Sequence, residues 1–227
     1  MNFADRRNWQ SGASLMEILV AMSISLVVTA AMVGLMSNSL SNTARIINMT
    51  KLTDDLRIAM LLMSRDLRRS SYSADAVNCF GNPDCGTDGS VSLPGDVTIN
   101  GDNDCVTFLL DRDHDGDATE NDAGGFRLAS SNGVGLLQMW IGGSAPDCTS
   151  TDANWAAITD SSNMEITAFS VDDDLSYTEV IYDNGFGVQK FQKVRKLRLS
   201  IDGRLLLDSS IHRSVADVIK LRNNIYL

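Results

Sequence analysis

The chain has 227 residues with a formal net charge of −10, and 44 % of them are hydrophobic and 21 % charged. This composition excludes a disordered chain and a membrane protein with many spans, and two histidines argue against a histidine-based zinc enzyme. Between Ser71 and Asp183 there are 21 acidic and two basic residues, so we expect no direct nucleic-acid binding by a basic surface. The acidic middle indicates metal sites, electrostatic docking between subunits, or a solvated acidic surface.

The N-terminal region joins a short polar segment to a long apolar one. Residues 1–12 are polar and include Arg6 and Arg7, and the 24 residues of Ala13–Met36 carry a single charge, Glu17. As a helix this run would measure about 36 Å, enough to cross a bilayer core of about 30 Å. A secretory signal has a shorter apolar core followed by a cleavage site. A plain anchor would rarely hold a carboxylate there, because its burial costs about 2.5–3.5 kcal/mol near the bilayer centre.

The residues Gly12-Ala13-Ser14-Leu15-Met16-Glu17, followed by the apolar run, resemble the N-terminus of type IV pilins, although the family usually has Phe where Ala13 stands. The resemblance implies cleavage between Gly12 and Ala13 by prepilin peptidase, which also methylates the new amino terminus. A buried carboxylate needs a partner. In a filament, the amino terminus of a neighbouring subunit can pair with Glu17, whereas on a plain anchor Glu17 would be a tolerated interfacial residue.

The helix is expected to continue beyond the apolar run. Residues 37–70 contain neither Pro nor Gly, and their apolar residues recur mostly three or four apart, as on one face of an amphipathic helix: Leu40, Ala44, Ile47, Leu52, Leu56, Met60, Met63 and Leu67. The sequence thus predicts one helix from Ala13 to Ser70. We divide the chain into a leader (1–12), a transmembrane and assembly half of the helix (13–36), its amphipathic half (37–71) and a periplasmic globular domain (72–227).

Two further segments indicate which members of the family the chain resembles. Thr53–Tyr72, which contains Arg-Asp-Leu-Arg-Arg, is similar to minor pilins of the PilW type and to the J pseudopilin of type II secretion. Ser214–Asn224 is similar to the C-terminal end of those proteins. The resemblance implies a type IV pilin fold, with a long helix packed on a β-rich domain.

The globular domain shows several strand candidates. Cys105–Leu110 is apolar and β-branched, Phe126–Ala129 and Val134–Ile141 flank a Ser-Ser-Asn-Gly turn, and Met164–Val171 alternates weakly. Asp202-Gly203 predicts a second hairpin, between Val194–Ile201 and Arg204–Leu207. We therefore expect an α+β protein in which the helix packs on an antiparallel sheet.

Four cysteines follow the apolar run, and in an oxidising periplasm an even number indicates two disulfides. Cys79–Cys85 would close a short loop and Cys105–Cys148 would tie a strand to a later loop, although two other pairings are possible. A metal site would need closely spaced cysteines of the type Cys-x-x-Cys, which this sequence lacks.

The segment Asp111–Asp122 follows a strand and fits the pattern Asp-x-Asp-x-Asp-Gly with a carboxylate at the twelfth position. Carboxylates at alternate positions can converge on one Ca²⁺ ion, and Gly116 permits the sharp turn. A solvated acidic turn is the alternative, and Asp122 is shorter than the usual Glu. The predicted ligands are Asp111, Asp113, Asp115, Asp117, Thr119 and Asp122.

Two classes of function remain open. The first is a structural protein: a minor pilin of a type IV pilus, in its initiating or tip complex, or a J-type pseudopilin. Its expected partners are prepilin peptidase, other minor pilins and the major pilin, or pseudopilins. We expect it in the bacterial inner membrane, with one span and a periplasmic domain, and then in the pilus. The second class is a membrane-anchored periplasmic enzyme or binding protein, which the absence of a catalytic motif disfavours.

Overall fold

The computed structural model describes residues 12, 14–74, 97–116, 119–143, 145–151, 153–183, 189–222 and 225–226. Five predicted features therefore lie outside the described residues: the leader up to residue 11, Ala13, Cys79, Cys85 and Asp117. The chain divides into two compact units, Met1–Asn48 and Met49–Leu227.

The long helix predicted from the sequence is confirmed. Helix α1 spans Leu15–Arg69, and its first turn is joined to the residue before it by backbone hydrogen bonds from Glu17 and Ile18 to the carbonyl of Ser14. Serine is a favoured residue at this capping position. In the first unit every described residue is exposed, including the large apolar side chains between Leu15 and Met36.

Several hydroxyl groups interrupt the apolar surface of α1, and each bonds to its own helix. Ser23 donates to the carbonyl of Val20 at 2.9 Å, and Thr29 donates to the carbonyl of Ser25 at 2.7 Å. The Ser25 hydroxyl donates in the same way to the preceding turn. These hydroxyls thus have partners without any contact outside the helix.

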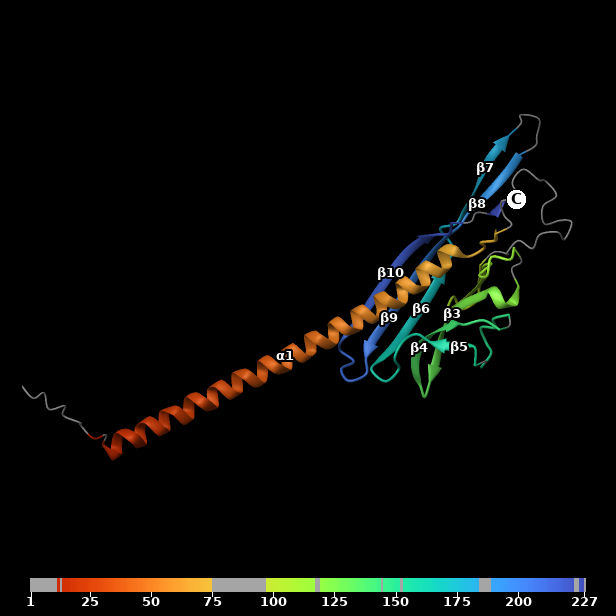
Figure 1. Cartoon of the computed structure of the whole chain (residues 1–227). Helices are drawn as coiled ribbons and strands as arrows, with labels where there is room; N and C mark the ends of the chain where they lie inside the picture. The colour runs from red at the N-terminus through yellow and green to blue at the C-terminus, as the bar shows by residue number, and fades with distance from the viewer. Residues whose placement is uncertain are drawn as a thin grey trace, which may run out of the picture. The chain divides into compact units, whose positions relative to one another are not determined.

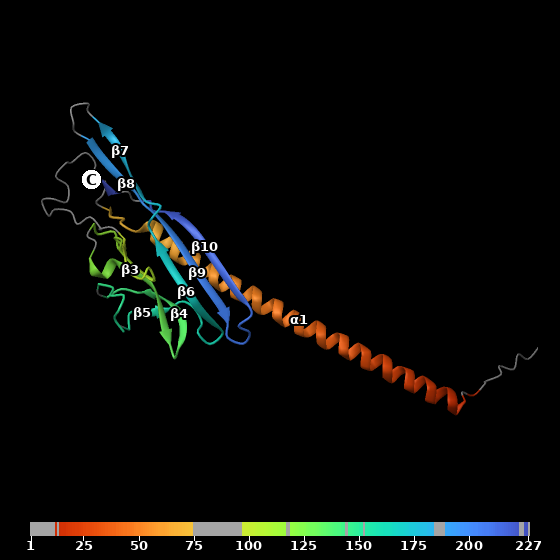
Figure 2. The ribbon, with the colours of Figure 1, turned by 180° about the vertical axis from the view of Figure 1, so that it is seen from behind.

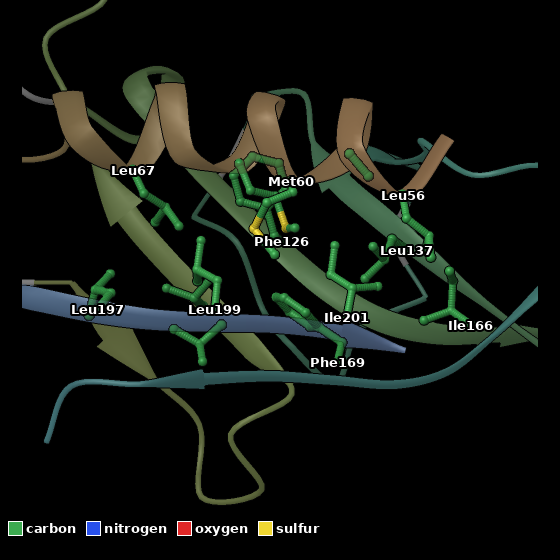
Figure 3. Packing of buried hydrophobic residues seen from close by; sticks show 14 of the residues in the cluster. Leu56, Met60, Leu67, Phe126, Leu137, Ile166, Phe169, Leu197, Leu199 and Ile201 are labelled. Carbon is green, nitrogen blue, oxygen red and sulfur yellow. The ribbon is translucent and has the colours of Figure 1, made fainter. Parts of the chain in front are cut away.

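The second unit buries the later part of the apolar stripe on α1. The buried stripe consists of Leu52, Leu56, Ala59, Met60, Met63, Ser64 and Leu67. Figure 3 shows Leu56, Met60 and Leu67 directed from the helix toward strand residues such as Leu199 and Ile201. Leu40, Ala44 and Ile47, which the periodicity places on the same stripe, are exposed in the first unit. The amphipathic pattern therefore extends into helix residues of the first unit whose side chains are exposed.

The described strands of the second unit form three antiparallel sheets (Figures 1 and 2). The first has the order β1-β2-β3-β4-β5, formed by Thr98–Ile99, Cys105–Leu109, Ala123–Ser131, Val134–Trp140 and Trp155–Ala157. The second has the order β10-β9-β6, formed by His212–Lys220, Lys196–Leu205 and Met164–Asp172. The third has the order β11-β8-β7, formed by Ile225–Tyr226, Gln189–Val194 and Tyr177–Asp183. Both views show β9 and β10 running alongside the C-terminal part of α1.

The core lies between α1 and the first two sheets. Phe126 and Leu137 of the first sheet join Ile166, Leu199 and Ile201 of the second in one buried cluster with the helix stripe. The expected α+β architecture, a long helix packed on antiparallel strands, is thus confirmed.

The predicted hairpin at Asp202-Gly203 is wrong. Strand β9 runs straight through both residues, which pair with β10 on one side and β6 on the other. Gly203 is buried, and a Cβ there would lie 3.2 Å from Leu56 Cδ2 and 3.4 Å from the carbonyl oxygen of Glu165. The glycine therefore permits the close approach of α1 to the sheet. The chain reverses only after Leu205, where the backbone N–H and hydroxyl of Ser210 both donate to Asp208.

The predicted disulfide Cys105–Cys148 is confirmed, and it links β2 to the loop after β4. Cys105 is buried beside Trp140 and Trp155, whose rings meet edge to face at 5.2 Å. Arg127 covers Trp155, and its Nη1 donates to the carbonyl of Cys148 at 3.0 Å. The loop is thus held by a covalent bond, a hydrogen bond and ring packing.

Candidate processing segment and candidate metal centre

The predicted cleavage point begins at an exposed glycine. Gly12 has no heavy atom within 4 Å of the position that a Cβ would occupy. Nothing in the described structure therefore requires glycine at this position, in contrast to Gly203. Ala13, on the other side of the predicted cut, lies outside the described residues.

Glu17 lies in the first turn of α1 with its side chain exposed. A carboxylate at this place is favourable for the helix, because the partial positive charge of the dipole lies at the N-terminus. Glu17 forms no ion pair with another described residue, and its neighbours Leu15, Met16, Ile18 and Leu19 are at least half exposed. The carboxylate is thus one charge set in an uncovered apolar surface.

The N-terminal part of α1 is long and apolar enough to cross a membrane, and none of that segment is buried in the structure. A single apolar helix attached to a globular domain fits a membrane-anchored protein. An apolar surface of this extent is costly to leave in water, so we expect it to be covered.

The acidic segment that follows β2 is tied to the chain leaving α1. The backbone N–H of Asp111 donates to the carbonyl of Tyr72 at 2.8 Å, and the backbone N–H of Ala74 donates to Oδ2 of Asp111 at 2.7 Å. The Ser73 hydroxyl donates to the carbonyl of Gly116 at 3.2 Å. These bonds position the start of the acidic segment against residues 72–74.

A sharp turn returns this segment toward Asp111. Gly116 has a φ of 93°, a conformation that glycine adopts without strain, and its N–H donates to Oδ2 of Asp111 at 3.2 Å. His114 also has a positive φ, and its ring meets that of Tyr72 edge to face at 5.5 Å. His114 is exposed, as expected for a residue between the predicted ligands.

The structure brings together three of the predicted calcium ligands. One carboxylate oxygen from each of Asp111, Asp113 and Asp115 lies within 4.8 Å of the other two. Asp113 and Asp115 are exposed, whereas Asp111 is fully buried. We call these three residues the aspartate cluster.

The buried carboxylate of Asp111 uses its two oxygens differently. Oδ2 accepts the hydrogen bonds from Ala74 and Gly116, while Oδ1 is buried and accepts no hydrogen bond from the described residues. The hydrogen bond from Ala74 contributes most to lowering the pKa of Asp111 below its ordinary value, although burial acts in the opposite direction. Asp111 therefore keeps one buried carboxylate oxygen that accepts no hydrogen bond from the described residues.

Asp122 is not a member of the aspartate cluster, and its carboxylate bonds to Thr119. Oδ1 of Asp122 accepts the N–H of Arg112 at 3.0 Å, and Oδ2 accepts the N–H and hydroxyl of Thr119 at 3.1 and 2.9 Å. Asp122 is buried and ends the short 3₁₀ helix Glu120–Asp122. Its carboxylate is thus engaged in closing the loop from within, a role that the twelve-residue pattern does not indicate.

A second acidic group, Asp172–Asp174, has carboxylate oxygens equally close together. These residues line a cavity of about 290 Å³ with Val97, Ile99, Asn100 and Asn103. Both groups contain a bond from a backbone N–H to the carboxylate two residues earlier, Asp174 to Asp172 at 2.7 Å and Asp115 to Asp113 at 3.4 Å. No member of the second group is fully buried, whereas Asp111 is. The group therefore resembles an ordinary acidic turn more closely than the aspartate cluster does.

Sequence reasoning missed the contribution of Tyr72, Ser73 and Ala74. These residues hold the acidic segment mainly through backbone groups and one hydroxyl. Only the change of composition after the helix marked this place, and a backbone donor leaves no residue-specific signal in a sequence.

The comparison with known families identifies one match. The family model described as prepilin peptidase-dependent protein B matches residues 45–221, which include the buried part of α1 and most of the globular domain. No curated protein and no solved structure matches the chain significantly.

Proposed function

The chain belongs to the family of prepilin peptidase-dependent protein B, and from that membership we propose that it is a minor pilin of the PilW type. The family makes it a pilin-like or pseudopilin-like protein with prepilin peptidase as a partner. The finer proposal is that it enters the initiating or tip complex of a type IV pilus with other minor pilins and the major pilin. The proposed role is structural rather than enzymatic.

The observation that carries this proposal is the coincidence of the family match with the arrangement of the N-terminal segment. An exposed Gly12, a carboxylate at residue 17 and an uncovered apolar helix occur in the register expected for a prepilin. A Cβ at residue 12 would meet no described atom within 4 Å, which supports the proposal that Gly12 is there for recognition by the peptidase.

The proposed assembly step uses the amino terminus that cleavage creates. Removal of residues 1–12 would leave Ala13 as a cationic terminus, which the peptidase then methylates. When subunits pack through their apolar helices, Glu17 of one subunit would pair with the terminus of its neighbour. The pairing matters because a single charge left among apolar side chains is strongly unfavourable.

The proposed location is the bacterial inner membrane, with α1 spanning it once and the globular domain in the periplasm before incorporation into the pilus. The Cys105–Cys148 disulfide supports this placement, because such bonds persist in oxidising compartments and are rare in the cytosol.

The proposal is tested by determining the mature N-terminus by mass spectrometry in a host with prepilin peptidase. We expect the mature protein to begin at a methylated Ala13. Gly12→Val should keep the leader, because the peptidase requires a small residue before the cut, while Gly12→Ala should still be processed. Normal processing of Gly12→Val, or a mature protein that starts elsewhere, would contradict the proposal.

A J-type pseudopilin of type II secretion is the alternative, because Thr53–Tyr72 is similar to both kinds of protein. Deletion of the gene distinguishes the two. Loss of pili with normal protein secretion supports the minor pilin, whereas secretion failure with normal piliation supports the pseudopilin.

A further inference from the structure

We propose that the aspartate cluster binds one Ca²⁺ ion, which fastens the chain leaving α1 to the end of β2. The proposal concerns a site of the folded domain and does not depend on whether the protein assembles into a pilus or a secretion system.

Three negatively charged side chains converge in the aspartate cluster. Three carboxylates place oxygens within 4.8 Å of one another in a part of the chain that is strongly acidic on both sides. Without a cation these charges repel each other at short range, where the Coulomb energy between two charges is large. A divalent ion between them would turn that repulsion into attraction.

One carboxylate oxygen of Asp111 lacks a hydrogen-bond donor among the described residues. Oδ1 is buried and receives no hydrogen bond from the described residues, while the other oxygen is fixed by two backbone N–H groups. A buried polar atom without a partner costs about 1–3 kcal/mol, and more for a charged group. A bound cation would give this oxygen a partner.

The chemistry of the cluster selects the ion. The cluster offers only carboxylate oxygens, which suit Ca²⁺ and Mg²⁺, whereas Zn²⁺ and Cu²⁺ prefer nitrogen or sulfur ligands. Ca²⁺ accepts six to eight oxygens in flexible geometry, with water completing the shell. Mg²⁺ demands a compact octahedron and gives up its water reluctantly, so the more adaptable Ca²⁺ is the ion we propose.

The ligand set proposed here differs from the twelve-residue pattern. Asp122 lies outside the aspartate cluster, and both of its oxygens accept hydrogen bonds, from Arg112 and Thr119. We therefore assign binding to the aspartate cluster and a structural role to Asp122. The site would connect two parts of the domain, because Asp111 is bonded to Tyr72 and Ala74 just after the helix.

The experiment measures binding and stability of the full chain purified in detergent. Isothermal titration calorimetry with CaCl₂ should give a Kd of about 10⁻⁴–10⁻³ M, the range of extracellular calcium modules. The melting temperature should be higher in calcium than in EGTA, and MgCl₂ or NaCl of equal ionic strength should reproduce little of the increase. Hydrogen exchange should show calcium-dependent protection at residues 71–74 and 109–116.

Three variants separate a specific site from general screening of acidic charge. Asp113→Ala with Asp115→Ala should weaken binding at least tenfold and abolish the calcium-dependent rise. Asp111→Asn, which keeps an oxygen for Ala74, should do the same. The matched control is Asp173→Ala with Asp174→Ala, which also removes two charges from an acidic cluster and should leave the calcium response unchanged.

The proposal fails if the full chain shows no calcium-specific binding or stabilisation. It also fails if the response survives in Asp113→Ala with Asp115→Ala, or if it disappears in the Asp173→Ala and Asp174→Ala control. Because mature processing is measured separately, failure here would leave the prepilin assignment untouched, and failure of processing would leave this site untouched.

Discussion

Removal of the Cys105–Cys148 bond should substantially destabilise the globular domain. The two cysteines are separated by 43 positions in the sequence. Closing a loop of that length lowers the entropy of the unfolded chain, and the chain-entropy relation gives a contribution of about 4 kcal/mol at 25 °C. Since domains are stable by only about 5–15 kcal/mol, the bond would supply a large share of the total.

The assay is urea unfolding of the full chain in detergent, followed by tryptophan fluorescence, because Trp140 and Trp155 are buried beside Cys105. The double variant Cys105→Ala and Cys148→Ala removes the bond without a reductant that would also act on other cysteines. Cys148→Ala alone breaks the bond but leaves the core side chain of Cys105 in place. If the cross-link dominates, both variants should lose about 4 kcal/mol.

A loss below about 1 kcal/mol in both variants would refute the entropic argument. A large loss in the double variant with little loss in Cys148→Ala would instead assign the effect to packing around Cys105. In cells, we expect the same variants to accumulate at lower levels, because destabilised proteins are removed by proteases.

Three further predictions concern the assembly segment, the helix contact and the response to acid. Glu17→Gln should be inserted and cleaved normally but incorporated into filaments poorly, because the charge on the neighbouring amino terminus then lacks its counterion; wild-type incorporation, scored by immunoblot of sheared filaments, would contradict the pairing. Gly203→Val should lower the free energy of unfolding by about 1–3 kcal/mol, because the added side chain overpacks against Leu56. The control is the same substitution at exposed Gly101, where a Cβ would meet no atom within 4 Å. Gly133 is unsuitable as a control because its φ of 81° would strain any other residue. Hydrogen bonds from Ser162 lower the pKa of Asp160, so its contribution to stability is present above the unfolded pKa of about 3.9 and is lost as pH falls toward the folded value. The unfolding midpoint of Asp160→Asn should therefore depend less on pH in that acid range, and an unchanged pH dependence would count against this assignment.

Most of the helix could be predicted because one periodic pattern specifies it. The buried residues between Leu52 and Leu67 recur at helical spacing, and no Pro or Gly interrupts them. The pattern could not show where burial starts, because Leu40 and Ile47 have the same spacing but are exposed. Periodicity shows which side chains share one face of a helix, but it does not show which surface covers that face.

The strands were predicted less evenly because local turn signals compete with tertiary packing. The Ser-Ser-Asn-Gly turn between β3 and β4 was identified correctly, with Asn132 and Gly133 both at positive φ. Asp202-Gly203 has an equally strong turn signal but lies inside β9, where the glycine makes room for Leu56. A sequence cannot distinguish a glycine that turns the chain from one that lets a helix approach.

Alternation of aspartates identified the aspartate cluster correctly as a convergent group. The pattern missed the engagement of Asp122 with Thr119 and the backbone donors after the helix. Those interactions depend on how a loop meets a distant segment, which spacing within the loop does not encode.

The hydroxyl groups of α1 affect the energy of moving the helix from a bilayer into contact with other helices. Because Ser23, Ser25 and Thr29 donate to carbonyls of their own helix, they require no donor or acceptor from lipid or from a neighbouring subunit. Moving such a helix from a bilayer into a bundle of similar helices would then break no hydrogen bond at these positions. At these positions lipid and a neighbouring helix would be nearly equivalent, so that under the proposed pairing Glu17 would be the group that distinguishes a correctly placed neighbour from another apolar contact.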